Sequence, residues 1–250
     1  ALFIRSKQGV YLTNYGKELF PYIKNVQNSE EYLQQAVAQI GGMEKGVVRI
    51  GTFNSACVEW MPSLLRGFEK DYPNIRIDIY QGSYDDVYQW LKDGIVDLGF
   101  LSSTSAGDLP CTPIYQDKII CVAPQGFKTE NKGYITIEEL KKQRFVTQRE
   151  GCDADVNHVM NKYDLPGGGG SYIADDMSAV SLVMGGFGVC LMPELVIRNI
   201  PFPVDVIPLE VEEKRTIVLA YVRSDVLAPA VQKMQSYILE SFQKKAEEEQ

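Results

Sequence analysis

Residues 9–51 read GVYLTNYGKELFPYIKNVQNSEEYLQQAVAQIGGMEKGVVRIG, in which a long helical pattern leads to a short apolar run. Thr13 predicts the start of the helix, because its hydroxyl can accept hydrogen bonds from the unpaired N–H groups of the first turn. Gly41 and Gly42 predict its end. The apolar run at 47–51 is typical of a buried strand, so the stretch joins a helical rod to the start of a second module.

An apolar stripe follows one side of the predicted helix. Its members recur at steps of three, four and seven residues, and only Glu30 interrupts them. Such a narrow seam suits a partner helix and predicts dimerisation. The alternative is an amphipathic helix that lies on its own domain, since about three heptads are near the minimum for a coiled coil. The stripe contains Leu19, Ile23, Val26, Leu33, Val37 and Ile40.

The composition is that of a globular chain. Its 250 residues are 45% hydrophobic and 23% charged, which leaves room for two small domains. The net charge of -8 argues against nucleic-acid binding by this chain alone, because phosphate contacts need clustered Lys and Arg. A membrane span of about 18 apolar residues and a signal peptide are both missing from the pattern, so we predict a cytoplasmic location and no membrane partner. The five cysteines are scattered and form neither a disulfide framework nor a metal motif, so no metal or cofactor is predicted.

From residue 47 the pattern alternates short apolar runs with helical ones, as in an α/β sheet with parallel strands. The first half predicts a βαβαβ unit. Its strands lie at 47–51, 75–80 and 96–101, with helices at 57–72 and 84–92. The second half predicts strands at 119–123, 144–147 and 188–192 and helices after Thr136, at 153–163 and after Asp175. A late strand at 216–222 precedes a final helix at 227–242.

The late strand and helix most easily rejoin the first half, so the middle segment is predicted to be an inserted domain. The fold class is therefore α/β, with two Rossmann-like lobes that enclose a cleft, preceded by the long helix. The run at 167–170 is four glycines and resembles an engineered linker, so no function is assigned to it. The predicted divisions are 1–12 as a module remnant, 13–42 as the helix, 46–121 plus 218–242 as lobe I, 122–217 as lobe II and 243–250 as a disordered tail.

Small polar residues follow the predicted strands. Ligands of open α/β sheets bind at the carboxyl ends of strands. Residues 51–56 lie between the first strand and its helix, where the helix N-terminus offers N–H groups and small hydroxyls to an anion or a polar ligand. The alternative is that Asn54 and Ser55 only cap this helix. In lobe II, Arg149 could pair with a carboxylate. The predicted ligand-binding residues are Thr52, Asn54, Ser55, Ser83, Ser102, Ser103, Thr147, Gln148 and Arg149.

Catalysis finds little support in the sequence, and we predict that the chain is not an enzyme. A nucleophile–histidine arrangement would depend on His158, which falls inside a predicted helix. The glycine-rich run at 185–188 precedes a strand, unlike a phosphate loop, and predicts a helix end with a tight turn. Cys152 lies at a predicted helix start, where the dipole can lower the pKa of a thiol, so it is a redox candidate without a nearby resolving cysteine.

Five motifs occur in order along nearly the whole chain. They are Leu2-Phe3-x-Arg5, Val10-x-Leu12-Thr13-x-x-Gly16, MPSLLRGFEKDYP at 61–73, GIVDLG at 94–99 and VMGGFGVCLMPE at 183–194. Together these motifs resemble LysR-type transcriptional regulators. The first two are similar to the end of the winged helix-turn-helix and the start of the linker helix of that family, and residues 61–73 are similar to its first regulatory helix.

The resemblance implies a bacterial regulator that lacks most of its winged helix-turn-helix and carries an effector domain folded like type 2 periplasmic binding proteins. It implies an effector between the lobes, in contact with Asn54, Ser55 and Ser83. It also implies self-association as a dimer or tetramer, and promoter DNA as a partner of the missing N-terminal domain. A subgroup senses peroxide near the position of Cys152, but its partner cysteine has no counterpart here.

The predicted mechanism is a small molecule in the cleft that shifts lobe closure and changes how paired subunits present their DNA-binding heads. A ligand can do this only through different affinities for the two arrangements. One alternative is a solute-binding protein of a transport system with the same fold, which the N-terminal helix disfavours. Another is an enzyme on the two-lobed fold, which would need catalytic residues that the sequence does not offer.

Overall fold

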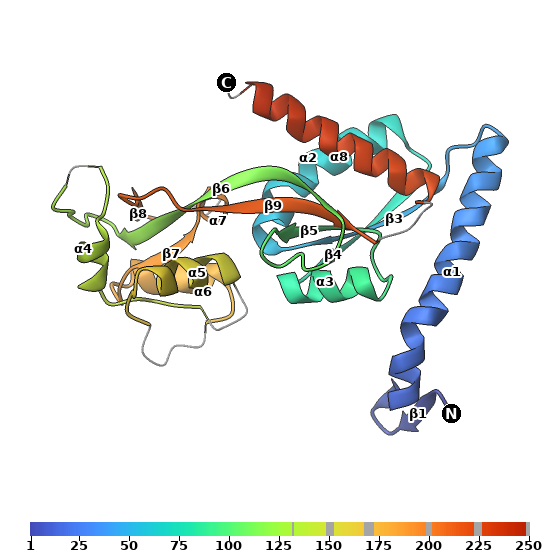
Figure 1. Ribbon diagram of the computed structural model, residues 1–250, viewed down its shortest axis with the longest axis horizontal. Coiled ribbons are helices and arrows are strands. Elements are labelled where there is room, and N and C mark those ends of the chain that lie inside the picture. Colours follow the sequence, from blue (N-terminus) through green and yellow to red (C-terminus); the bar gives the residue numbers. More distant parts are fainter. Residues whose placement is uncertain (132, 149–152, 168–172, 199–201, 223–226, 249–250) are drawn as a thin grey trace.

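The computed structural model describes residues 1–248 except 132, 149–152, 168–172, 199–201 and 223–226. It contains two lobes side by side, with a long helix at one end (Figure 1). The hairpin of β1 (Phe3–Ser6) and β2 (Gly9–Leu12) leads into α1 (Asn14–Ile40). None of the described helices is both long and apolar enough to cross a membrane.

Lobe I is a sheet covered by helices on both faces. Its strands follow the order β4-β3-β5-β9-β6, and α2 and α8 cover one face while α3 covers the other (Figure 1). The elements are β3 (Gly46–Thr52), α2 (Asn54–Asp71), β4 (Ile75–Gln81), α3 (Tyr84–Lys92), β5 (Leu98–Ser102), β6 (Cys111–Pro124), β9 (Lys214–Tyr221) and α8 (Pro229–Glu248).

Strand directions confirm part of the predicted parallel sheet. β3 runs parallel to both β4 and β5, as the βαβαβ pattern predicts. β9 is antiparallel to β5 and to β6, so the parallel prediction is wrong there. The reason is connectivity: β6 leaves lobe I for lobe II and β9 comes back, so the two must run in opposite directions.

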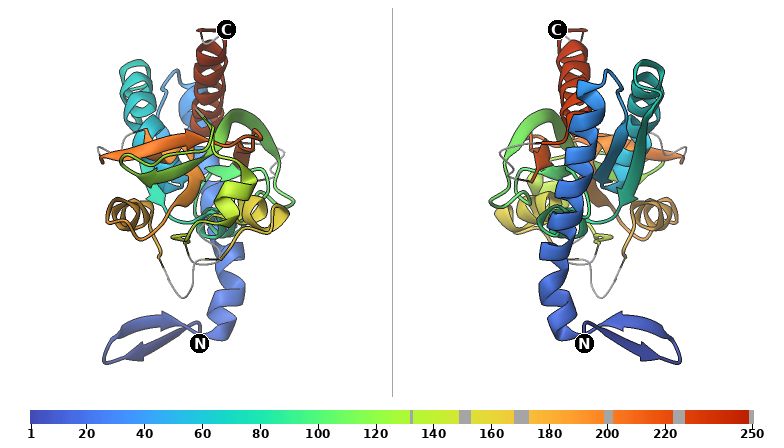
Figure 2. Two further views of the ribbon diagram at one scale, coloured as in Figure 1. Left: turned by 90° about the vertical axis from the view of Figure 1, so that its left-hand side faces the viewer. Right: turned by 90° about the vertical axis from the view of Figure 1, so that its right-hand side faces the viewer.

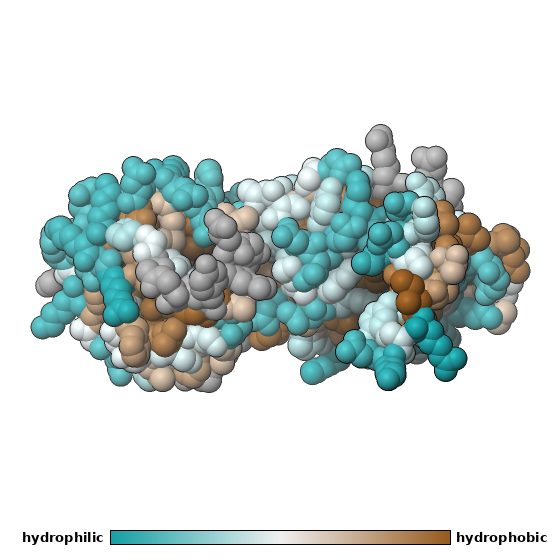
Figure 3. All heavy atoms as spheres, turned by 90° about the horizontal axis from the view of Figure 1, so that it is seen from below, coloured by the Kyte–Doolittle hydropathy of each residue, from teal (hydrophilic) through white to brown (hydrophobic). Residues whose placement is uncertain are grey.

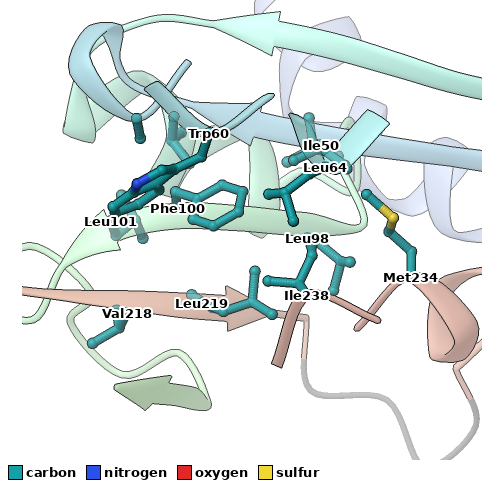
Figure 4. Close-up of a cluster of buried hydrophobic side chains, with 14 of the residues drawn as sticks. Ile50, Trp60, Leu64, Leu98, Phe100, Leu101, Val218, Leu219, Met234 and Ile238 are labelled. Carbon is teal, nitrogen blue, oxygen red and sulfur yellow. The ribbon is translucent and has the colours of Figure 1, made fainter. Parts of the chain in front are cut away.

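The core of lobe I lies on both faces of the sheet, with Val87 and Leu91 of α3 on one face and the side chains of α2 and α8 on the other. Trp60 and Leu64 of α2 and Met234 and Ile238 of α8 point at Leu98, Phe100 and Leu219 from the sheet (Figure 4). All are almost completely buried. The spacing of three and four residues along each helix places these side chains on one face.

Lobe II has two hydrophobic cores, one on each side of β6, because successive side chains of this strand point to opposite faces. It contains α4 (Ile137–Lys141), α5 (Ala154–Lys162), α6 (Asp176–Met184), β7 (Cys190–Pro193), α7 (Glu194–Ile197) and β8 (Val204–Pro208), with β7 and β8 on either side of β6. Ile119 and Cys121 of β6 pack under α4 and α5, whereas Ile120 and Val122 pack under α6 and α7. Successive side chains of a strand point to opposite faces, so a continuous apolar run serves both.

Two predictions about elements are wrong. Residues 144–147 form no extended strand; only Phe145 bridges to Val189, because Gly188 brings the chain close at that one point. The predicted disordered tail is also wrong through residue 248, since α8 continues to Glu248. Residues 244–248 are good helix formers, and neither glycine nor proline interrupts them.

The helix α1 starts as predicted, with the Thr13 hydroxyl accepting from Gly16 N at 2.9 Å. It lies on lobe I through polar side chains. Asn28 Nδ2 donates to Gly94 O at 2.9 Å, Tyr32 OH donates to Asp97 Oδ1 at 3.0 Å, and Glu31 Oε2 accepts from Arg49 at 2.8 Å. The N-terminal half of α1 and the hairpin project away from the lobes (Figure 2). The sequence left open which face meets the lobe, and the structure places the polar face there.

Candidate functional site

A cavity of about 440 Å³ lies between the lobes, at the carboxyl ends of β3 and β4. Its walls come from the start of α2, the β4–α3 turn, the residues that begin α5 and α6, and the start of β9. Both lobes therefore contribute. The lining residues are Phe53, Asn54, Ser55, Gln81, Gly82, Ser83, Tyr84, Asp86, Gln148, Asp153, Ala174, Asp175, Asp176, Met177, Val196 and Arg215.

The start of α2 differs from the other helix starts at this cavity. Ser83 caps α3, Asp153 caps α5 and Asp175 caps α6, each by accepting from first-turn N–H groups. In the described part of the chain, α2 begins after Phe53 without a side-chain cap. Its first-turn N–H groups remain available to an anion or a polar ligand. Asn54 and Ser55 are the first residues of the helix, so the alternative that they only cap it is wrong.

Arg215 is the buried cation at the floor of the cavity. Its Nη2 donates to Asp117 Oδ2 at 2.7 Å and to Ser55 Oγ at 3.0 Å, and its Nη1 donates to Tyr84 OH at 2.7 Å. Only 2% of its side chain is exposed. Burial alone would lower the pKa of the guanidinium, but Tyr84, Asp153 and Asp117 together raise it, so Arg215 stays charged. Arg215 thus ties the start of α2 to the start of α3.

Asp153 is a carboxylate in a mostly buried position, with 13% of its side chain exposed. Burial raises its pKa to about 6, and Asp155 and Asp176 add to the effect, while Arg215 and the Val156 N–H oppose it. Its Oδ2 lies 4.0 Å from Arg215 Nη1. A carboxyl whose pKa is this high binds a proton more readily than an exposed aspartate, and a nearby cation would favour the charged form.

Asp176 joins the two lobes across the cavity. Its Oδ2 accepts from Asn54 Nδ2 of lobe I at 3.2 Å, and its Oδ1 accepts from Gln148 Nε2 of lobe II at 2.7 Å. A second contact between the lobes lies deeper, where Thr104 Oγ1 donates to Asp155 Oδ1 at 2.9 Å. The lobes are therefore held in one arrangement by polar side chains that a ligand can meet.

The predicted ligand-binding residues divide into two groups. Asn54, Ser55, Ser83 and Gln148 line the cavity. Thr52 and Ser102 are fully buried beneath it, and Ser103 is exposed outside it. Thr147 lines a smaller void of about 20 Å³ next to Gln148 inside lobe II. Arg149 and Cys152 lie outside the described residues, and so do Gly168, Gly169 and Gly170 of the glycine run.

Sequence reasoning missed Arg215, Asp153 and Asp176. Asp176 follows Asp175 at a helix start, where capping would explain both carboxylates, but Asp175 alone caps that helix. Arg215 carried one signal, a charge at the start of an otherwise apolar strand. Among the described residues, the acidic, histidine and cysteine side chains form no group placed to hold a metal. The described Cys121 is buried, and burial raises the pKa of its thiol to about 12, which makes it inert at neutral pH.

The chain resembles transcriptional regulators throughout its length. Residues 41–243 match the family described as the LysR substrate binding domain. The transcriptional dual regulator GltC of Bacillus subtilis is 24% identical over 252 residues, which cover 97% of this chain and 83% of GltC. An uncharacterized HTH-type regulator of the same organism, YvbU, is 23% identical and matches 84% of this chain and 72% of its own length.

Solved structures share the fold. The effector-binding domain of QuiR in complex with shikimate aligns with a TM-score of 0.71 at 19% identity, covering 80% of this chain and 98% of that domain. Full-length CbnR in complex with its target DNA aligns with a TM-score of 0.66 at 16% identity, covering 97% and 84%. The family match decides for a regulator against a solute-binding protein or an enzyme. The chain therefore belongs to the LysR family of transcriptional regulators, and residues 41–243 are its effector-binding domain.

Proposed function

We propose that the cavity between the lobes binds the small-molecule effector of this regulator. The observation that carries the proposal is that one ligand-sized space is lined by polar groups of both lobes: the start of α2, which has no side-chain cap, and the hydrogen-bonded pair of Asp176 and Gln148. Its volume of about 440 Å³ falls within the usual range for small-molecule sites.

Regulation follows from the place of the cavity. A ligand held by both lobes favours the arrangement in which both sets of groups reach it, so its differential affinity shifts the lobes toward that arrangement. The shift passes to the rest of the regulator through lobe I and α1, which contact each other through Asn28, Glu31 and Tyr32. Reciprocity requires that promoter engagement change effector affinity by the same factor.

Ligand binding should raise the thermal stability of the chain. Carboxylic acids, sugar acids and amino acids are added one at a time, and the midpoint of thermal unfolding is measured by fluorescence. A ligand at ~100 times its dissociation constant adds about 2.7 kcal/mol, hence a shift of several degrees. Ser55→Ala should abolish most of the shift, because it removes a polar group from the cavity wall.

Ser63→Ala serves as the matched control, since Ser63 lies on the same helix outside the cavity and its hydroxyl donates only to Trp60 O. It should leave the ligand shift unchanged. An equal ligand shift in both variants would place the ligand elsewhere and sink the effector-cavity proposal.

We also propose that α1 pairs with α1 of a second copy. The stripe that sequence periodicity singled out faces away from lobe I, with Val26 72% and Ile40 89% exposed. Hydrophobic side chains gather at the end of the molecule that α1 forms (Figure 3). Exposed apolar stripes of this kind mark interaction sites, and the polar face of α1 is already occupied by lobe I.

Charges in the stripe should dissociate the assembly. Val26→Glu combined with Val37→Glu is expected to raise the dimer dissociation constant at least ~100-fold, or about 2.7 kcal/mol, because each carboxylate would be buried without a partner. Sedimentation over a range of concentrations measures it. Gln34→Glu with Gln39→Glu adds the same charge to α1 off the stripe and should leave the assembly intact. Equal behaviour of the two double variants would exclude pairing through this face.

We assign the binding of promoter DNA to a winged helix-turn-helix of the whole regulator. We also place the regulator in the cytoplasm, where that DNA lies. The acidic balance of this chain supports the division of labour, since a net charge of -8 does not attract phosphates. The fold shared with DNA-bound CbnR over 97% of this chain supports it as well.

A further inference from the structure

We propose that the effector is an amino acid, whose ammonium group is held by Asp176 and Asp153 and whose carboxylate lies at the start of α2. The inference rests on the proposed effector cavity and names the ligand class that its charges select.

The described walls of the cavity are acidic. They contain four carboxylates, Asp86, Asp153, Asp175 and Asp176, and one cation, Arg215. Asp86 is engaged in the capping box of α3, and Asp175 accepts from Ser178 N in capping α6. A ligand with two carboxylates would therefore meet an excess of like charge, which disfavours binding.

Arg215 cannot correct this imbalance for a dianion. Its Nε and Nη2 both donate to Asp117 Oδ2, at 3.0 and 2.7 Å, so its charge is already paired inside the protein. Its side chain is 2% exposed. Among the described residues that line the cavity, no second cation balances the carboxylates, so a ligand that carries a positive charge is favoured there.

Asp176 is the group best placed to receive it. Its two oxygens accept one amide hydrogen each, from Asn54 and Gln148, and a carboxylate has lone pairs for about four hydrogen bonds. Neither amide carries charge, so the anion is oriented but not neutralised. Asp153 faces the same space: its Oδ1 caps α5, whereas its Oδ2 lies 4.0 Å from Arg215 Nη1 and has room for a further donor. Burial raises its pKa, and the like charge of Asp176 adds to the effect. An ammonium with three donors between them would satisfy both carboxylates.

The start of α2, whose first residue Asn54 donates to Asp176 Oδ2 at 3.2 Å, suits the carboxylate of the same molecule, because the ammonium and carboxylate of an amino acid are attached to one carbon. The first turn of the 18-residue helix α2 faces the cavity without a side-chain cap, beside the Ser55 hydroxyl. Its N–H groups and dipole favour a negative charge. Phe53, Met177 and Val196 supply apolar wall of the same cavity, which can pack against an amino-acid side chain.

Calorimetric titration of the full chain tests the inference with matched ligand pairs. The probes are the standard L-amino acids and, for each one that binds, the carboxylic acid that lacks only the amino group. At least one amino acid is expected to bind, and removal of its amino group should weaken binding at least ~100-fold. Asp176→Asn should weaken binding of the amino acid at least ~10-fold and should weaken binding of the deaminated acid much less, since Asn keeps the shape of the side chain but loses its charge.

Asp164→Asn is the control: it makes the same change on the exposed surface of lobe II, in a left-handed conformation that Asn also tolerates. It should bind as the unaltered chain does. Asp153→Asn provides a second variant, because Asn can still cap α5, and it should repeat the selective loss if Asp176→Asn fails to fold.

Each other result overturns the inference. Deaminated acids that bind as tightly as amino acids, or in place of them, would show that the cavity takes anions; the effector cavity would stand and its amine selectivity would fall. Binding of an amino acid that survives both Asp176→Asn and Asp153→Asn would place its ammonium elsewhere. Failure of every amino acid overturns the amino-acid class, and the Ser55→Ala comparison then judges the effector cavity separately.

Discussion

Replacing Arg215 by methionine is expected to lower the free energy of unfolding by about 3–5 kcal/mol, the range found when one partner of a buried ion pair is removed. Asp117, 1% exposed, would lose the cation that donates to it, while the neutral hydrogen bond from Leu195 N would remain. Tyr84 and Ser55 would lose their hydrogen bonds to the guanidinium as well. Burial already raises the pKa of Asp117 and Arg215 opposes this, so the variant should take up a proton at Asp117.

Urea unfolding followed by circular dichroism measures the loss. Arg198→Met is the matched control, because Arg198 is 40% exposed and its pairs with Glu59 and Glu194 are 4.0 and 3.8 Å long; it should cost at most about 1 kcal/mol. Adding Asp117→Asn to Arg215→Met should recover part of the stability, since no buried charge is then left unpaired. A loss below about 1 kcal/mol for Arg215→Met would show that the ion pair does not hold the lobe junction.

Gly188→Ala is expected to cost about 2–5 kcal/mol, from backbone strain and overpacking together. Gly188 has φ +145°, a conformation that residues with a Cβ rarely adopt. A Cβ there would meet the carbonyl oxygen of Arg144 within van der Waals contact. That carbonyl cannot move away freely, because it accepts from Val189 N at 2.9 Å while Val146 N donates back to Val189 O at 2.8 Å.

Gly186→Ala separates the two causes. Gly186 also has a positive φ, +80°, but a Cβ there would meet nothing within 4 Å. It should cost only about 1–2 kcal/mol, the penalty of the left-handed conformation. Equal losses at the two glycines in urea unfolding would show that close backbone approach at Gly188 contributes nothing.

Local patterns predicted the elements well because local chemistry determines them. The capping residues Thr13 and Thr136 begin helices where the sequence places them, and the three strands of the βαβαβ unit form with the predicted pairing. The same logic brought Asn54 and Ser55 to the cavity, since a strand end and a helix start meet there by geometry. The strand predicted at 144–147 does not form, because an apolar run indicates burial and does not show whether the backbone pairs with a neighbouring strand along its length.

The charged centre of the site could not be predicted, because its partners meet only in the folded chain. Arg215 and Asp117 lie 98 residues apart, on two strands whose antiparallel pairing depends on the return of the chain from lobe II. The periodicity of α1 identified its apolar stripe, but which face meets lobe I depends on Gly94, Asp97 and Arg49, which no local pattern connects to the helix.

The position of β9 has a consequence for synthesis on the ribosome. β9 lies between β5 and β6 in the sheet, yet it is made after all of lobe II. Phe100 of β5 pairs with Leu219 of β9, which is synthesised about 120 residues later. Until then, this edge of β5 has no partner strand. Lobe II can pack its own helices against β6 first, so lobe I, whose synthesis starts earlier, completes its sheet last. During that interval the nascent chain exposes an unpaired strand edge that is prone to aggregation.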